Sequence, residues 1–328
     1  MRVLITGITG FLGRHLARHL VARGHDVRGF ASSPPDDDAL PPQVRTRVAD
    51  LTDIDDVVAA VAWAAPQRIV HLGALSHVGT SWRRPGDYLR VNVAGTHNLL
   101  RAVEAWSGPP VRLLFASSAE VYGQVPPDAQ PIAEDRPVDP RSPYAMTKAS
   151  GELVARTAGA VIVRLFNVVG PGQATTFALP SFAHQLATIA LGENDDAVLR
   201  VGDLSPRRDV TPVGDAVEGL RLALERGEGG TVYNLASGRA HSIRDLLDAL
   251  IARSGVAATI EVDPERVRPV DIPQLCGDAG RLRALGWSPR ADGLDAVLDA
   301  LYDEARERVV RGDDGRSQPA SSDERGDA

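Results

Sequence analysis

The stretch RVLITGITGFLGRHLARHL at residues 2–20 decides the fold that the sequence predicts. Its apolar start is typical of a buried strand, and its second half is typical of an amphipathic helix. Between them stand Gly7, Gly10 and Gly13. Glycines at this point permit a tight turn and let backbone N–H groups approach a pyrophosphate at the positive end of a helix. The GxxGxxG spacing differs from the GxGxxG dehydrogenase fingerprint, and a plain strand–helix turn is the alternative. The position of the trio favours a dinucleotide site.

Short apolar runs alternate with amphipathic stretches through the first half of the chain, which is typical of βαβ units and a parallel sheet. The expected strands are Arg2–Thr6, Asp26–Phe30, Val44–Val48, Arg68–Leu72, Arg112–Ser117, Ala160–Arg164, Val198–Val201 and Val232–Asn234. The expected helices are Leu12–Arg23, Ile54–Ala64, Asn92–Ala105 and Tyr144–Thr157. We therefore expect an α/β fold, a Rossmann-type doubly wound parallel sheet with a smaller C-terminal α/β substrate-binding domain.

The composition changes after Gly170, where Gly/Pro-rich loops mix with short helices, as in substrate-binding regions built around a rigid sheet. We expect an NAD(P)-binding Rossmann domain at residues 1–166 and a substrate-binding domain at 167–311. A segment near 210–236 is expected to return to the first domain. The polar tail at 312–328 has little to bury and is expected to be disordered.

Composition and charge exclude several classes of protein. A formal net charge of -7 and a pI near 5.6 argue against general nucleic-acid binding. The single cysteine, Cys276, excludes an internal disulfide and suits a reducing cytoplasm. No apolar run approaches the roughly 20 residues that span a bilayer, and the chain begins with strand sequence instead of a signal peptide. A cytoplasmic location is therefore expected. His71, His77 and His184 lack metal-ligand spacing, so no metal site is expected.

Tyr144 and Lys148, in SPYAMTK, are four residues apart and share one face of any helix. Alone, this pair is better explained by a solvated helix face than by catalysis. With the glycine turn and the serine pair of FASSAEVYG upstream, it indicates acid/base catalysis on a sugar or alcohol oxygen. We expect the lysine cation to lower the pKa of the phenol from about 10 toward working pH. Ser118 is preferred to Ser117 because of its spacing before Glu120, and a local backbone hydrogen bond is its alternative role.

Together these residues resemble the extended short-chain dehydrogenase/reductase superfamily, which comprises nucleotide-sugar epimerases, dehydratases and reductases. The resemblance covers nearly the whole chain and rests on the ordered motifs GITGFLG, HLGALSHVGTSW, NVAGTHNLL, FASSAEVYG, SPYAMTK, RLFNVVGPGQ, VGDLSPRRD and VRPVDIPQLCGD. The last three are most similar to the GDP-mannose branch, which contains a 4,6-dehydratase and its partner reductase. The resemblance therefore implies a nicotinamide-dependent enzyme that acts on a GDP-linked sugar.

The resemblance also implies a role for each matching residue. Ser118 would hydrogen-bond the reacting sugar oxygen, Tyr144 would be the acid/base, and Lys148 would hold both Tyr144 and the nicotinamide ribose. Asn167 would contact the diphosphate region of the substrate. The catalytic candidates are Ser118, Tyr144, Lys148 and Glu120, and the substrate-binding candidates are Ser76, Ser118, Glu120, Asn167, Arg208 and Arg268.

Arg208 and Arg268 are implied to clamp the diphosphate and the nucleotide. Their chemistry agrees, because a guanidinium offers charged, bidentate donors that suit phosphate better than lysine does. A surface ion pair with Asp209 is the alternative for Arg208, and a simple loop charge is the alternative for Arg268.

The cofactor preference depends on the end of the second strand, which reads Gly29-Phe30-Ala31-Ser32-Ser33. No acidic residue stands there to accept from a ribose 2′-hydroxyl, so NADP(H) is slightly favoured over NAD(H). For Asn92, the alternative to cofactor binding is a structural role at the start of a helix. The cofactor-binding candidates are Gly7, Thr9, Gly10, Phe11, Leu12, Gly13, Ser32, Ser33, Asp50, Leu51, Leu72, Gly73, Ala74, Asn92, Tyr144 and Lys148.

Ala119 and Glu120 bear on the type of reaction. In dTDP-glucose-type dehydratases an Asp-Glu pair stands here, and the Asp delivers a proton that Ala119 cannot deliver. Glu120 suits a reductase, as a sugar contact, and a dehydratase, as the base at C5. Ser32-Ser33 in place of paired arginines, and the segment GPGQ at residues 170–173, favour the reductase.

We therefore expect reduction of GDP-4-keto-6-deoxy-D-mannose to GDP-D-rhamnose by NAD(P)H. A GDP-mannose 4,6-dehydratase and a nucleotide-sugar C4-epimerase are the alternatives within the superfamily. A cofactor-binding sensor or scaffold without turnover is the alternative outside enzymes.

A homodimer is expected through a four-helix contact between two copies of the helices Asn92–Ala105 and Tyr144–Thr157. Both helices carry apolar residues beyond a sheet-facing stripe, and internal core packing is the alternative. The candidate contact residues are Leu99, Leu100, Val103, Leu153 and Val154.

Overall fold

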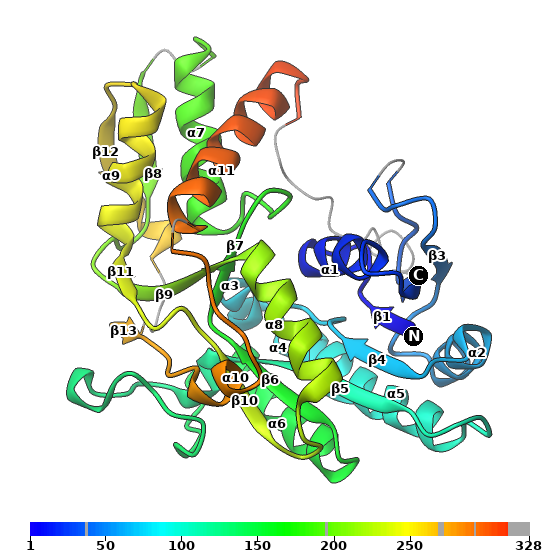
Figure 1. The fold of residues 1–328 in the computed structure, drawn as a ribbon. Helices are drawn as coiled ribbons and strands as arrows, with labels where there is room; N and C mark the ends of the chain where they lie inside the picture. Colours follow the sequence, from blue (N-terminus) through cyan, green and yellow to red (C-terminus); the bar gives the residue numbers. More distant parts are fainter. Residues whose placement is uncertain (37–38, 194–195, 268–271, 292, 314–328) are drawn as a thin grey trace, which may run out of the picture.

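The computed structural model describes residues 1–36, 39–193, 196–267, 272–291 and 293–313. Its centre is a seven-stranded parallel sheet in the order β10-β6-β5-β4-β1-β2-β3 (Figure 1). The strands are β1 (Arg2–Thr6), β2 (Asp26–Ala31), β3 (Arg45–Val48), β4 (Arg68–His71), β5 (Arg112–Ser118), β6 (Val161–Leu165) and β10 (Val232–Leu235). The strand order reverses beside β1, and this reversal is where open α/β sheets bind ligands. The predicted Rossmann-type α/β fold is confirmed.

Helices cover both faces of this sheet. The helices α1 (Phe11–Val21) and α8 (Val213–Arg226) pack on one face, and α2 (Ile54–Ala64), α5 (Gly95–Glu104) and α6 (Pro143–Thr157) pack on the other. Along β1, Val3 and Ile5 face the first core, whereas Leu4 faces the second. This alternation follows from the two-residue period of a strand, and burial on both faces explains why the strand is apolar throughout.

A second group of elements lies beside the large sheet, at the upper left of Figure 1. Its strand β9 (Arg207–Pro212) pairs with β7 (Asn167–Val169), β11 (Ala240–Ser242) and β13 (Gln274–Leu275), while β8 (Val198–Val201) pairs with β12 (Thr259–Val262). The helices α7 (Ala178–Ala190), α9 (Ile243–Ser254) and α11 (Gly293–Val310) build its apolar core. The short helix α10 (Gly280–Ala284) instead contacts β10 and α8.

The chain returns from this group to the large sheet through α8 and β10, which lie within the segment near 210–236. The boundaries at residues 166 and 311 stay predictions. The strand predicted from Val44 begins at Arg45, and the strand predicted from Ala160 begins at Val161. The predicted tail from residue 314 onward lies outside the described residues.

The helix predicted from Asn92 to Ala105 was wrong at its start. The structure has α3 (Val78–Arg83), α4 (Pro85–Tyr88) and a π-helical turn, Leu89–Ala94, before α5 continues the same rod. Single π-helical turns recur at functional sites because the extra residue re-aims side chains. Here the turn carries Asn92.

Among the described residues, no helix has both the length and the apolar character needed to cross a bilayer. Over the same residues, no group of three or more His, Cys, Asp or Glu side chains is placed to hold a metal ion.

Candidate active site

Helix α6 brings Tyr144 and Lys148 into the interior. The Ser142 side chain caps the helix by accepting a hydrogen bond from the Ala145 N–H at 3.1 Å, and Pro143 occupies the first turn, where its missing N–H is harmless. Tyr144 and Lys148 lie one turn apart on the face that is buried. The solvated helix face is therefore wrong as an explanation of this pair.

The end of β5 supplies the partner of the tyrosine. Ser118 is the last residue of β5, its side chain is buried, and it hydrogen-bonds the Tyr144 phenol. Its oxygen also accepts from the Glu120 N–H at 3.2 Å. Ser117 is used elsewhere, because its hydroxyl donates to Glu152 at 2.9 Å. The structure thus brings together Ser118, the serine that spacing preferred, and Tyr144.

Burial dominates the ionisation of Tyr144. Loss of hydration raises the pKa of Tyr144 to about 12, although the hydrogen bond with Ser118 acts in the opposite direction. The nearby Glu120 carboxylate and the Tyr88 ring raise this pKa further. The predicted lowering of the phenol pKa is therefore wrong for the protein alone, since desolvation outweighs it. At neutral pH the phenol carries its proton.

Lys148 is also shaped by burial. Loss of hydration lowers the pKa of Lys148 to about 8, and the Glu152 carboxylate opposes this shift. The ammonium lies 4.6 Å from the centre of the Phe115 ring, whose face attracts a cation. A buried ammonium with a pKa near 8 is still mainly charged at pH 7.

The glycine turn after β1 fits a dinucleotide. Gly7 has φ +67°, and a Cβ there would come within 2.8 Å of the Gly73 backbone, so only glycine allows this approach. A Cβ on Gly13 would lie 2.3 Å from the Gly7 carbonyl oxygen. Helix α1 starts after Gly10 with no side-chain cap and no acidic residue in its first turn. Its N-terminal N–H groups are therefore left to a negatively charged ligand such as a pyrophosphate.

The other cofactor candidates differ in how far they are buried. Thr9, Phe11 and Leu12 are half-buried at the start of α1, and Leu72, Gly73 and Ala74 are half-buried after β4. Leu51 is buried and would contact any side chain placed at Gly73. Ser32 and Ser33 are exposed at the end of β2. The carboxylate of Asp50 accepts from the Thr52 N–H at 2.8 Å, so it closes a local turn.

Asn92 belongs to the protein framework. Its side chain accepts from the Leu75 N–H at 2.8 Å and donates to the Leu75 carbonyl at 3.0 Å and to the Thr147 hydroxyl at 3.0 Å. Both amide hydrogens are therefore satisfied within the chain. These bonds favour the structural alternative for Asn92, and its role as a direct cofactor ligand stays a prediction.

The predicted substrate-binding residues are only partly assembled. Asn167 is exposed at the start of β7, and Ser76 is exposed after β4. Arg208 is buried on β9, where its guanidinium donates to the Ile272 carbonyl at 2.7 Å. Arg268 lies outside the described residues.

The proposed surface ion pair between Arg208 and Asp209 is wrong, because Asp209 is fully buried. Its carboxylate accepts hydrogen bonds from the Ser237, Gly238 and Gly277 N–H groups at 2.7, 2.9 and 3.2 Å. It joins β9 to two loops that are far apart in the sequence, at residues 237–238 and at residue 277. Only the VGDLSPRRD motif drew attention to it, and its partners could not be read from spacing.

Tyr88 is a further residue that the sequence did not single out. Its ring lies 6.4 Å from the Tyr144 ring in an edge-to-face arrangement, and its hydroxyl donates to the His77 carbonyl at 2.6 Å. Its only signal was an aromatic residue one helical turn before Asn92. The Tyr88 ring packs against one side of the Tyr144 ring.

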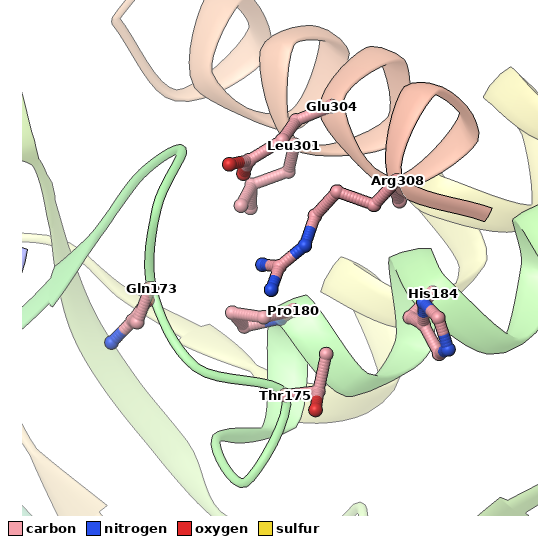
Figure 2. A pocket seen from close by; sticks show the side chains of 8 residues that line it. Gln173, Thr175, Pro180, His184, Leu301, Glu304 and Arg308 are labelled. Atoms are coloured by element: carbon pink, nitrogen blue, oxygen red, sulfur yellow. The ribbon is translucent and has the colours of Figure 1, made fainter. Parts of the chain in front are cut away.

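The GPGQ segment is tied to two helices. The Arg14 guanidinium and the His15 ring of α1 contact the Gly172 and Pro171 carbonyls at 3.0 and 2.8 Å. From α11, the Glu304 carboxylate accepts from the Gly172 N–H at 2.8 Å. Figure 2 shows Glu304 and Arg308 of α11 facing this loop across a small pocket. The loop therefore couples the cofactor helix to the second group of elements.

Comparisons with known proteins identify relatives of the chain. The family model described as GDP-mannose 4,6 dehydratase matches residues 4–298. A GDP-6-deoxy-D-mannose reductase from Pseudomonas aeruginosa is 33% identical over an alignment of 317 residues, and the match covers 93% of this chain and 99% of that protein.

Two solved structures extend the comparison. The structure of RMD from Pseudomonas aeruginosa complexed with NADPH has 31% identity and a TM-score of 0.82, and the match covers 94% of this chain and 100% of that one. The UDP-glucose 4-epimerase of Thermus thermophilus in complex with NAD has 30% identity and a TM-score of 0.83, with 93% and 99% covered.

Proposed function

The chain belongs to the GDP-mannose 4,6-dehydratase family within the extended short-chain dehydrogenase/reductase superfamily, and from this premise we propose that it is a reductase. It is a nucleotide-sugar enzyme of that superfamily with a nicotinamide cofactor. The proposed reaction converts GDP-4-keto-6-deoxy-D-mannose to GDP-D-rhamnose at the expense of NAD(P)H.

One observation carries the proposal. The Tyr144 phenol is buried, protonated at neutral pH and hydrogen-bonded to Ser118. A group in this state is ready to donate a proton, which is what the carbonyl oxygen of a 4-keto sugar requires when it becomes an alkoxide. A base for an alcohol oxidation would instead need a lowered pKa.

The roles of the residues follow from this arrangement. A bound reduced nicotinamide supplies a hydride to C4 of the sugar. Ser118 orients the sugar oxygen, and Tyr144 donates its proton to that oxygen as negative charge develops there. The Lys148 ammonium, buried close by on the same helix, stabilises the phenolate that remains.

Two residues bear on the choice between reduction and dehydration, and they point in opposite directions. Ala119 is buried in the apolar core, so no acid stands where the dTDP-glucose-type dehydratases have one. Glu120 lies close enough to raise the pKa of Tyr144, and a base in that place would suit removal of a C5 proton. A GDP-mannose 4,6-dehydratase is therefore the second candidate, and Glu120 is the residue that favours it.

For the ligands, we propose NADPH as the preferred cofactor, because exposed Ser32 and Ser33 offer hydroxyls and no carboxylate to a ribose 2′-phosphate. Asn167, Ser76 and Arg268 are proposed to contact the sugar nucleotide. Arg208 is proposed to act beside them while it holds the Ile272 backbone. A cytoplasmic location stays a prediction.

We propose a homodimer in which α5 and α6 of two copies meet. Leu153 on α6 is 66% exposed, and Leu100, Val103 and Val154 are half-buried. Leu99 of α5 is fully buried in the core between the helix and the sheet and cannot contribute, so its inclusion among the contact residues was wrong.

Product analysis by mass spectrometry tests the reaction. The purified enzyme is incubated with GDP-mannose alone, and separately with GDP-4-keto-6-deoxy-D-mannose and NADPH. The proposal predicts a product two mass units heavier only in the second reaction. Loss of water from GDP-mannose in the first would identify a dehydratase instead, and Tyr144→Phe is the control that should be silent in both.

A further inference from the structure

Three buried side chains, between two backbone groups, form a continuous hydrogen-bonded chain beneath the glycine turn. The Gly73 N–H donates to Thr6 Oγ1 at 3.0 Å, and Thr6 Oγ1 lies 2.7 Å from His71 Nδ1. His71 Nε2 lies 3.0 Å from Thr96 Oγ1, whose hydroxyl donates to the Asn92 carbonyl at 2.6 Å. Thr6, His71, Thr96 and Asn92 are all at most 2% exposed.

The two ends of the chain fix the direction of every bond in it. The Thr96 hydroxyl proton goes to the Asn92 carbonyl, so Thr96 Oγ1 must accept the hydrogen of His71 Nε2. In a neutral ring that carries its hydrogen on Nε2, Nδ1 is an acceptor, so the Thr6 hydroxyl, which accepts from the Gly73 N–H, donates its own proton to Nδ1. A neutral imidazole protonated at Nε2 satisfies all four bonds. A second proton, on Nδ1, would leave the buried Thr6 proton without this acceptor.

The surroundings of His71 favour the neutral ring. Burial lowers the pKa of His71 to about 3, and the Lys148 ammonium acts in the same direction. The ring lies between β1 and β5, opposite Thr6 and Phe115 in the strand register. Of the groups that face it, Thr6, Phe115, Thr96 and Asn92 do not titrate, and Lys148 of α6 is the charged one.

The chain joins the segments that we propose to hold the cofactor. Gly73 packs against Gly7, because a Cβ on Gly7 would come within 2.8 Å of the Gly73 Cα. At the other end, the Asn92 side chain binds both the N–H and the carbonyl of Leu75. Asn92 also holds Thr147, the residue before Lys148. His71 connects these two ends, because it bonds Thr6, which precedes Gly7, and Thr96, which bonds the Asn92 carbonyl.

We propose that His71 is a positioning residue for the nicotinamide dinucleotide, acting as a neutral imidazole of fixed tautomer that sets the distance between the Gly7 turn and residues 73–75. It touches neither reacting atoms nor substrate in this role. The inference rests on the proposed function only in taking a nicotinamide dinucleotide as the ligand.

Thr96→Val tests the proposal because it keeps the shape of the side chain and removes its hydrogen bonds to His71 and Asn92. We expect the Kd for NADPH to rise about tenfold, the effect of one lost buried hydrogen bond, while the Kd for GDP stays unchanged. Thr96→Ser, which keeps the hydroxyl, should restore NADPH binding. A lowered Tm with an unchanged Kd for NADPH would make the chain part of the core only and overturn the proposal.

A spectroscopic measurement on the wild-type enzyme covers the case in which Thr96→Val does not fold. The ¹⁵N spectrum of histidine-labelled protein, assigned by single substitutions, should show His71 neutral and protonated at Nε2 from pH 5 to 9. Addition of NADPH should shift its Nδ1 signal, because Thr6 and Gly73 flank the cofactor. A ring that titrates in this range, carries its proton on Nδ1, or ignores NADPH would contradict the proposal.

Failure of the proposed function would look different. Wild-type enzyme that binds NADPH but reduces no keto sugar would refute the reductase and leave the role of His71 standing. Wild-type enzyme that binds neither NADPH nor NADH would remove the ligand and overturn both.

Discussion

Ser118, at the end of β5, hydrogen-bonds the phenol of Tyr144, which lies in the first turn of α6. The contact joins a strand end to a helix start, two places where the backbone is well fixed. It also gives the buried phenol a hydrogen-bonding partner, which limits the free-energy cost of burying a polar group. The reaction proposed here depends on the proton that this phenol holds.

Tyr144→Phe removes that proton and little else. Turnover should fall by at least about 100-fold, because a positioned general acid contributes roughly 10²–10⁴ in rate. GDP affinity, measured by calorimetry, should not change, since the phenol is not proposed to bind the nucleotide. Turnover within tenfold of wild type would take Tyr144 out of the mechanism.

Lys148→Met should change how stability depends on pH. The folded pKa of Lys148 is about 8, below the usual 10.5, so between these values the unfolded chain holds a proton that the folded chain has released. Stability from this group therefore rises with pH above 8 and is lowest below it. At pH 7 the variant should be more stable than wild type, because it has no buried charge. From pH 7 to pH 9.5 this difference in the free energy of unfolding, measured in urea, should shrink by about 2 kcal/mol.

Lys148→Arg keeps the charge and serves as the control for this measurement. At pH 7 it should be no more stable than wild type, because the buried charge remains. A wild-type and Lys148→Met difference that is the same at both pH values would mean that Lys148 is solvated in the folded protein.

Asp209→Ala should destabilise the second group of elements. The carboxylate accepts from the backbone N–H groups of Ser237, Gly238 and Gly277, and its loss leaves one buried and two half-buried donors without this acceptor. We expect a loss of about 3–5 kcal/mol in the free energy of unfolding, measured in urea. Asp203→Ala, at an exposed aspartate, should cost less than about 1 kcal/mol. Equal effects of the two variants would refute the role of Asp209.

The fold was predictable because its signals are local. The strand, glycine turn and helix of the first 20 residues repeat the two-residue and 3.6-residue periods that burial imposes, and the strands of the large sheet appear within one or two residues of their predicted ends. Tyr144, Lys148 and Ser118 were predictable for the same reason, since each lies at a fixed point of a local element.

What the sequence missed depends on distant contacts. The π-helical turn at Leu89–Ala94 arises where Asn92 binds Leu75 and Thr147, a pairing that no local period encodes. The direction of the Tyr144 pKa shift depends on how completely the surrounding elements exclude water. Asp209 binds partners in two separate loops, at residues 237–238 and 277, and spacing along the chain carries no record of them.

Leu153→Glu tests the proposed dimer. The side chain is 66% exposed on α6, so a carboxylate there should be harmless in a monomer and strongly unfavourable in an apolar helix contact. Light scattering at micromolar concentration should give a dimer mass for wild type and a monomer mass for the variant. Val262→Glu, at a 62% exposed residue on β12, is the control and should leave the dimer intact. A monomeric wild type would exclude the proposed contact.

Reductant stoichiometry, measured in wild type and in Glu120→Gln, tests the central claim most directly. The substitution keeps shape and hydrogen bonding but removes a base able to take a proton from sugar C5. The reductase account predicts one NADPH oxidised per GDP-4-keto-6-deoxy-D-mannose consumed, no turnover of GDP-mannose without reductant, and a rate in Glu120→Gln within about tenfold of wild type, the loss of one sugar contact. Conversion of GDP-mannose to the 4-keto sugar without reductant, stopped by Glu120→Gln, would contradict it.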